Sequence, residues 1–181
     1  MVDRRKGIES LPKLVLAVAI AVLTGVLAQV AFYIGPIPYT LQNTGVVLAG
    51  LLLPPKYAFL SQVLYLLMIV LGIPVAAGFR GGIHVLLEHT GGYLVAFPAA
   101  SLLMSLLSRR YLARLGGDLD RIGRKGFAVL LALSAIAVVP VYVLGFTVFT
   151  YYALGSENLM KSEYFGISGD KLLILFTATV A

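Results

Sequence analysis

The chain has 181 residues, of which 60% are hydrophobic and 12% are charged, and its formal net charge is +6. Soluble domains carry about a quarter of their residues as Asp, Glu, Lys and Arg, so this composition predicts one integral membrane domain, residues 1–181, and argues against nucleic-acid binding. The chain has no cysteine, which excludes disulfides, thiolate catalysis and Cys-based metal sites. The basic start runs into an apolar stretch of about 20 residues, a length typical of a membrane span rather than a cleavable signal peptide.

An all-α bundle of six helices is expected from the apolar stretches. A basic head, residues 1–13, comes first, and a charged loop, 108–126, separates the fourth helix from the fifth. The expected helices are 14–34, 41–53, 57–72, 90–107, 127–152 and 171–181. The second is too short to cross a bilayer alone at about 1.5 Å per residue. Thr90 is placed to cap the fourth helix, and Pro140 predicts a kink in the fifth.

The basic residues predict the orientation of these helices. With the N-terminus in the cytoplasm, the inner segments carry eleven Lys and Arg residues and the outer segments carry three, which agrees with the positive-inside rule. The outer three are Arg80, Lys161 and Lys171. The sequence therefore predicts a multi-pass protein of the cell membrane whose unusual loops, including 35–42 and 74–90, meet at the outer face.

The segment 74–93 differs most from the apolar sequence around it. It contains five glycines, both histidines, Arg80 and Glu88. Irregular backbone cannot face lipid, because each unpaired N–H or C=O group there costs several kcal/mol. We therefore expect this segment to form one wall of a binding site at the outer face.

Candidate ligand groups in and near this segment each have a simpler structural alternative. Arg80 can hold a carboxylate bidentately or reach for lipid phosphates. Glycines allow close approach of backbone to a ligand, and the three at issue are Gly78, Gly81 and Gly82. Tyr39 and Tyr93 flank the outer loops and are assigned to the pocket, while the other tyrosines near span ends fit an interfacial belt. Asp170 and Lys171 either cap the last helix or present an acceptor and a cation to a ligand.

Ala17, Ala21 and Gly25 repeat at four-residue spacing along the first helix. Faces of small residues permit close helix contact in membranes. The face either packs inside the bundle or docks a partner protein, and we assign partner docking to these three residues.

Catalysis is not expected. Both histidines lie in the outer loop, away from the serines of the spans, and no Asp or Glu is assigned to the interior of a span. His84 and Glu88 could share a helix face, but nothing else in the sequence supports a metal site. We predict no enzyme activity, no catalytic residues, no metal and no cofactor.

Three stretches resemble the BioY family, the biotin-binding S components of energy-coupling factor (ECF) vitamin importers. They are GPIPYTLQNTGVVLAGLLLPP, LYLLMIVLGIPVAAGFRGG and HTGGYLVAFPAA. The resemblance implies a six-helix S-component fold that binds biotin near the outer face and works with a transmembrane coupling protein and two cytoplasmic ATPases. It also implies that Thr40 and Gln42 lie in a first-loop motif closing over the site, and that residues 78–82 and 169–170 match two further site motifs.

The chain departs from the family pattern at two places. Leu173 stands where the family usually has a lysine, with Lys171 next to Asp170 instead, and Glu88-His89 stands where the family often has Gly-Pro. No GxxxxGK[ST] motif is present, so any ATP hydrolysis falls to a partner. The sequence predicts a biotin-binding subunit of a vitamin importer. The alternatives are an S component for another small vitamin and a structural membrane protein without a ligand.

Overall fold

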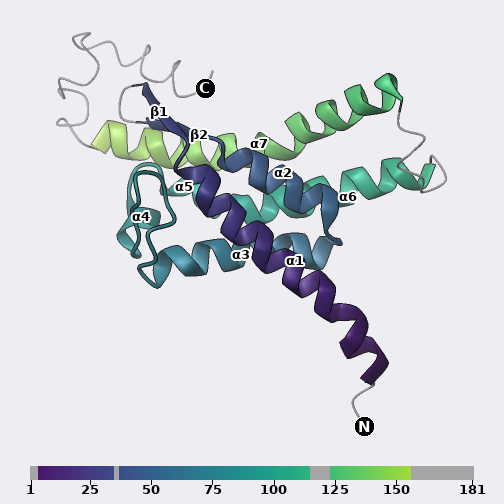
Figure 1. Ribbon diagram of the computed structural model, residues 1–181. Coiled ribbons are helices and arrows are strands. Elements are labelled where there is room, and N and C mark those ends of the chain that lie inside the picture. The colour runs from purple at the N-terminus through teal and green to yellow at the C-terminus, as the bar shows by residue number, and fades with distance from the viewer. Residues whose placement is uncertain (1–3, 35–36, 115–122, 156–181) are drawn as a thin grey trace.

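The computed structural model describes residues 4–34, 37–114 and 123–155, and over these ranges the chain is mostly helical (Figure 1). In chain order the elements are α1 (Arg4–Ala28), β1 (Ala31–Ile34), β2 (Ile37–Thr40), α2 (Gln42–Leu52), α3 (Pro55–Val70), α4 (His84–Leu87), α5 (Gly91–Val95), α6 (Phe97–Arg114) and α7 (Arg124–Gly155). The predicted sixth helix, with Asp170 and Lys171, lies outside the described residues.

A short β-hairpin follows α1, which sequence analysis did not predict. β1 pairs antiparallel with β2, with Ala31 opposite Thr40. The prediction that the first helix continues to residue 34 is therefore wrong. The two strands are rich in aromatic and β-branched residues, which favour strands. Pro36 and Pro38 have no N–H for a helix, so the hairpin satisfies backbone groups that a helix could not.

The fourth helix and the charged loop also have different bounds from those predicted. A turn at Ala96 separates α5 from α6, and α6 continues to Arg114. α7 begins at Arg124, so helices occupy both ends of the segment 108–126 that we expected to be a loop. Arginine is a good helix former, and its long side chain carries the charge away from the apolar surface. The change from apolar to basic residues therefore does not end α6.

α2, α3 and α7 agree closely with the helices predicted from the sequence. α7 contains Pro140, and Figure 1 shows α7 changing direction along its length. Within the described residues, three helical stretches are long and apolar enough to cross a membrane: Ser10–Ala28, Gly91–Arg114 and Arg124–Tyr152. A fourth apolar helix, α3, is shorter. These findings support an integral membrane protein.

The small residues of α1 lie inside the bundle. Ala17 is 0% exposed and Ala21 is 1% exposed, and a Cβ atom added to Gly25 would lie 2.9 Å from the Cβ of Val75. This burial favours packing inside the bundle, and docking of a partner by these three residues stays a prediction. Their side chains are small because α1 packs closely on α2, α3 and the loop after α3, the alternative that the sequence left open.

Three serines on one face of α6 fix this helix against α2 and α3. Ser101 donates its hydroxyl to the carbonyl of Ala58 at 3.0 Å, and Ser105 donates to the carbonyl of Leu53 at 2.7 Å. Ser108 donates to the carbonyl of Gly50 at 3.3 Å. Two of these carbonyls lie at the end of α2, where the helix itself leaves carbonyls without a partner. The serines thus satisfy polar backbone groups in an apolar setting.

The two ends of the bundle differ in character. Figure 1 shows the hairpin, α4 and α5 gathered at one end, and the arginine-bearing end of α6 at the other. Arg109, Arg110 and Arg114 belong to that second end. The hairpin and the loop between α3 and α4, two of the segments that the sequence marked as unusual, therefore lie at one end of the bundle, away from the basic residues of α6 (Figure 1).

Candidate binding site

A cavity of about 290 Å³ lies at the end formed by the hairpin, α4 and α5. This volume is close to the lower limit of about 300 Å³ for small-molecule sites. The residues that line it are Phe32, Tyr39, Thr40, Leu41, Gln42, Asn43, Ala76, Ala77, Arg80, Val85, Thr90, Tyr93, Leu94, Phe97, Val141 and Tyr142. Five of the predicted binding residues are among them: Tyr39, Thr40, Gln42, Arg80 and Tyr93.

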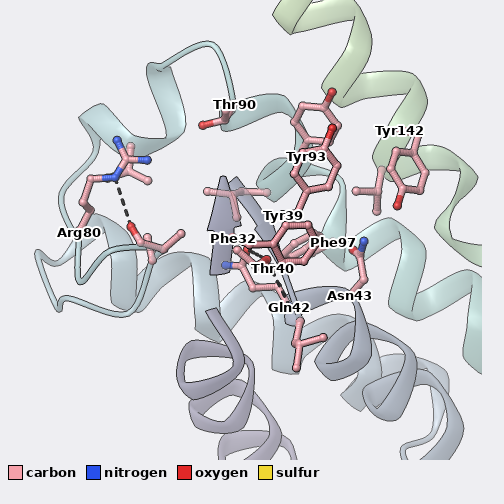
Figure 2. Close-up of a pocket in the computed structure, with 16 residues that line it drawn as sticks. Phe32, Tyr39, Thr40, Gln42, Asn43, Arg80, Thr90, Tyr93, Phe97 and Tyr142 are labelled. Carbon is pink, nitrogen blue, oxygen red and sulfur yellow. Dashed lines mark hydrogen bonds between the residues drawn. The ribbon is translucent and has the colours of Figure 1, made fainter. Parts of the chain in front are cut away.

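Arg80 is the single Lys or Arg among the described residues that line the cavity. Its Nε donates to the carbonyl of Ala77 at 3.3 Å, and its Nη1 forms an ion pair with Glu88 Oε2 at 2.6 Å. Figure 2 shows Arg80 at one side of the cavity and Asn43 with Tyr142 at the other, with aromatic rings between them. The cavity thus has a cationic side and a neutral polar side.

A chain of hydrogen bonds joins the hairpin to the glycine-rich loop between α3 and α4. Thr40 Oγ1 donates to Gln42 Oε1 at 2.6 Å, and Gln42 Nε2 donates to the hydroxyl of Tyr65. The Tyr65 hydroxyl in turn donates to the carbonyl of Val75 at 3.1 Å. Gln42 is 6% exposed and Tyr65 is 0% exposed, so these bonds form in a dry environment. Both polar atoms of the Gln42 side chain are engaged, and the residue positions the walls of the cavity.

Aromatic rings form most of the wall between the two polar sides. Phe32 and Tyr39 stack across the hairpin with ring centroids 5.5 Å apart. Burial, and then the neighbouring phenol of Tyr142, raise the pKa of Tyr39, so its hydroxyl stays protonated at neutral pH. The wall therefore offers flat apolar surfaces together with neutral hydroxyl groups, which suits a ring-containing ligand.

Tyr93 is held in the wall by direct contact between α5 and α7. A Cβ atom added to Gly145 would collide with the ring of Tyr93. A Cβ atom added to Gly92 would lie 2.7 Å from the carbonyl oxygen of Leu144. The glycines therefore set the distance between α5 and α7, and with it the position of Tyr93 in the cavity.

Asn43 carries a buried polar atom without a partner. Its Oδ1 is buried and forms no hydrogen bond within the described part of the chain. Figure 2 shows the amide of Asn43 and the hydroxyl of Tyr142 pointing toward one another across the neutral side of the cavity. A buried acceptor without a partner costs about 1–3 kcal/mol. A ligand N–H group bonded to this oxygen would recover that cost.

Three glycines of the 74–93 segment shape the loop between α3 and α4. Gly78, Gly81 and Gly82 are absent from the cavity wall, where Ala76 and Ala77 lie instead. Gly78 and Gly82 have φ angles of 70° and 103°, a region that favours glycine, and a Cβ atom on Gly81 would lie 2.5 Å from the carbonyl oxygen of Ile73. These glycines shape the loop, and their contact with a ligand stays a prediction.

Gln29, just after α1, holds the same loop in place. Its Nε2 donates to the carbonyl of Ala76 at 3.0 Å, and its Oε1 accepts from the backbone N–H of Phe79 at 3.0 Å. Phe79 is the non-glycine residue with a positive φ angle among those described, at 56°. The two bonds from Gln29 support this unfavourable backbone conformation and fix the loop that carries Arg80.

Several lining residues were missed by sequence analysis. Thr90 was assigned as a helix cap, and it does occupy the N-cap position of α5, but its side chain makes no capping hydrogen bond and lines the cavity. Asn43 is a polar residue within an apolar helix, which is a signal that could have identified it. Phe32, Phe97 and Val141 are apolar residues in an apolar chain, and nothing in the pattern separates them from lipid-facing neighbours.

The chain is similar to one known family and to curated members of it. The model of the BioY family matches residues 4–181. The chain is 54% identical over 84 residues to "Probable biotin transporter BioY" of Pyrococcus horikoshii, covering 46% of this chain and 52% of the relative. It is 42% identical over 104 residues to the Bacillus subtilis protein of the same name, covering 54% and 56%. The chain thus spans about half the length of these curated relatives.

A solved structure has the same fold. A crystal structure of the S-component for biotin from an ECF-type ABC transporter superposes with a TM-score of 0.67 at 21% identity, covering 99% of this chain and 90% of that one. The described helices that are apolar enough to span a membrane, together with this fold, are those of an integral membrane protein with a cavity at one end of its bundle. The chain belongs to the BioY family.

Proposed function

We propose that this chain is the biotin-binding subunit of an ECF-type importer. The observation that carries the proposal is the cavity, in which Arg80 lies at one side, the amide of Asn43 at the other and aromatic rings between them. Biotin has the same sequence of groups. Its valerate carboxylate is an anion, its alkyl chain and tetrahydrothiophene ring are apolar, and the ureido ring fused to that ring carries two N–H donors and a carbonyl.

The roles of the lining residues follow from this match. Arg80 is the described candidate for the carboxylate, since a guanidinium holds a carboxylate with two parallel hydrogen bonds. Asn43 Oδ1 is the acceptor for a ureido N–H. Tyr39 and Tyr93 enclose the ring, while Thr40 and Gln42 hold the hairpin over it. Asp170 and Lys171, proposed from the sequence as a second acceptor and a second cation, lie outside the described residues and stay in the proposal.

The proposal includes partners and a topology. A single domain of six spans would work with a transmembrane coupling protein and two cytoplasmic ATPases in the cell membrane. The basic end of α6 is supported as the cytoplasmic end by the arginines that it carries, and the cavity end then faces outward. A ligand-binding site at the outer face is what an importer subunit requires.

The experiment that tests the function is equilibrium binding of radiolabelled biotin to the purified protein. Unlabelled biotin should displace the label, while riboflavin and thiamine at the same concentration should not, because neither carries both a carboxylate and a ureido ring. Displacement by another vitamin and not by biotin would identify an S component of different specificity. Absence of any saturable binding by folded protein would reject a biotin-binding function.

A further inference from the structure

The ion pair between Arg80 and Glu88 lies at the cationic side of the cavity. Arg80 lines the cavity and Glu88 does not, so the carboxylate approaches the guanidinium from the loop behind it. The distance of 2.6 Å between Nη1 and Oε2 is that of a charge-assisted hydrogen bond. Glu88 also ends α4, where it takes an extended conformation as the C-cap residue.

This ion pair changes the charge that a ligand meets. Arg80 is the one Lys or Arg among the described lining residues. Among the residues whose side chains the structure describes, Glu88 is the one Asp or Glu. The pair is formally neutral. A carboxylate ligand that approaches Arg80 therefore meets a guanidinium that is already paired with the Glu88 carboxylate. It also meets the negative charge of that carboxylate.

Two consequences follow for an anionic ligand. Glu88 occupies one N–H direction of Arg80 and the carbonyl of Ala77 occupies another, so fewer donors are left for a second carboxylate. Two carboxylates beside one guanidinium also repel each other. A neutral ligand in the same cavity meets neither cost, since it brings no charge to Arg80.

We propose that Glu88 is a specificity-determining counter-ion, which lowers the affinity of the cavity for carboxylate ligands by competing for Arg80. Glu88 acts through Arg80 as a competing anion, without a contact of its own to the ligand. The proposal rests on the proposed function, because biotin supplies the carboxylate. By lowering this affinity, Glu88 would favour release of an anionic ligand over its retention.

The size of the effect is limited by solvent. The side chains of Arg80 and Glu88 are 40% and 32% exposed, so water screens the pair. Ion pairs at such exposure are worth little, and their removal changes an equilibrium by about twofold to fivefold. The expected gain in biotin affinity on removal of the Glu88 charge is of this order.

The test compares biotin with biotin methyl ester, which has the same ring system and no charge. Glu88→Gln keeps an oxygen for Arg80 and removes the charge, and Glu88→Ala also frees the guanidinium. We expect biotin to bind about twofold to fivefold more tightly to both variants, with the larger gain for alanine. The affinity for the methyl ester should stay unchanged. Glu9→Gln, which makes the same change in net charge on α1, should alter neither affinity.

Three results would overturn the inference. Weaker binding of biotin to Glu88→Ala, with rescue by Glu88→Gln, would mean that Glu88 holds Arg80 in its productive position. Equal gains for biotin and its ester would mean a general change in the cavity. Unchanged affinities in both variants would mean that the pair does not compete with the ligand. Wild-type protein that binds neither compound would instead reject the proposed function, a result distinguishable from all three.

Discussion

The Gln42 side chain donates a hydrogen bond to the Tyr65 hydroxyl inside the bundle, and this bond connects the two segments that enclose the cavity. Gln42 belongs to the start of α2, next to the hairpin, and Tyr65 bonds to the backbone of the glycine-rich loop at Val75. The hairpin and the loop are far apart in sequence, and their relative position is set by these two buried side chains. The shape of the cavity thus depends on residues behind its wall.

Tyr65→Phe tests this connection. The variant removes the bond to Val75 and leaves the Nε2 of Gln42 without its acceptor. We expect the affinity for biotin to fall about twofold to tenfold, because one neutral hydrogen bond contributes about 0.5–1.5 kcal/mol. Titration of the purified protein measures the affinity. Tyr57→Phe is the matched control on the same helix, since Tyr57 does not line the cavity. Equal biotin affinities of Tyr65→Phe and Tyr57→Phe would show that the hydrogen bonds of Tyr65 do not contribute to ligand binding.

Gly145→Ala should displace Tyr93 from the cavity wall. An added Cβ collides with the ring, which must rotate or move into the cavity. We expect biotin affinity to fall at least about tenfold, which corresponds to about 1.4 kcal/mol of lost contact. Gly123→Ala is the control, because a Cβ there meets no atom within 4 Å. In a Tyr93→Ala background the substitution at Gly145 should cost little more, and a full additive loss would contradict the explanation.

Asn43→Leu should change stability and binding in opposite directions. Leucine removes a buried acceptor that has no partner among the described residues, which relieves about 1–3 kcal/mol in the ligand-free protein. The melting temperature without ligand should therefore rise by several degrees. Biotin affinity should fall about twofold to tenfold, since the ureido N–H loses its acceptor. A more stable variant with wild-type affinity would show that Asn43 does not contact the ligand.

Sequence analysis predicted the parts of this fold that depend on long apolar helices. α2, α3 and α7 were found because prolines and glycines end apolar runs there, as at Pro54 and Gly72. The hairpin was missed because Ala31–Ile34 is as apolar as the helix before it, and its strand state depends on pairing with Ile37–Thr40. Local sequence does not contain that tertiary information.

The candidate site was predicted in part for a related reason. Arg80, Tyr39 and Tyr93 stand out as polar or aromatic residues at the ends of apolar stretches, and all three line the cavity. The buried face of Ala17 and Ala21 was assigned to a partner, because the spacing of small residues is the same for contacts within a bundle and between proteins. The Arg80–Glu88 pair depends on the path of the loop, which the sequence does not specify.

The proposed topology can be tested with cysteines, since the chain has none. Ile83→Cys reports on the cavity end, because Ile83 is 59% exposed and has a φ angle of −60°, so a cysteine there is not strained as it would be at Gly82. Gly123→Cys reports on the other end. An impermeant thiol reagent should label the cysteine at 83 in intact cells and the cysteine at 123 only after lysis. The reverse pattern would contradict an outward-facing cavity.

The most direct test of the central claim is to fill the cavity. Ala77 lines it, and Ala77→Trp would place a large ring where the ligand is proposed to bind. Ala99→Trp adds the same ring at an exposed position of α6 and serves as control. Biotin binding is then measured for both purified variants, after gel filtration has shown that they elute as the wild type. The account predicts that Ala77→Trp loses saturable biotin binding and Ala99→Trp retains it, and wild-type affinity in folded Ala77→Trp would contradict it.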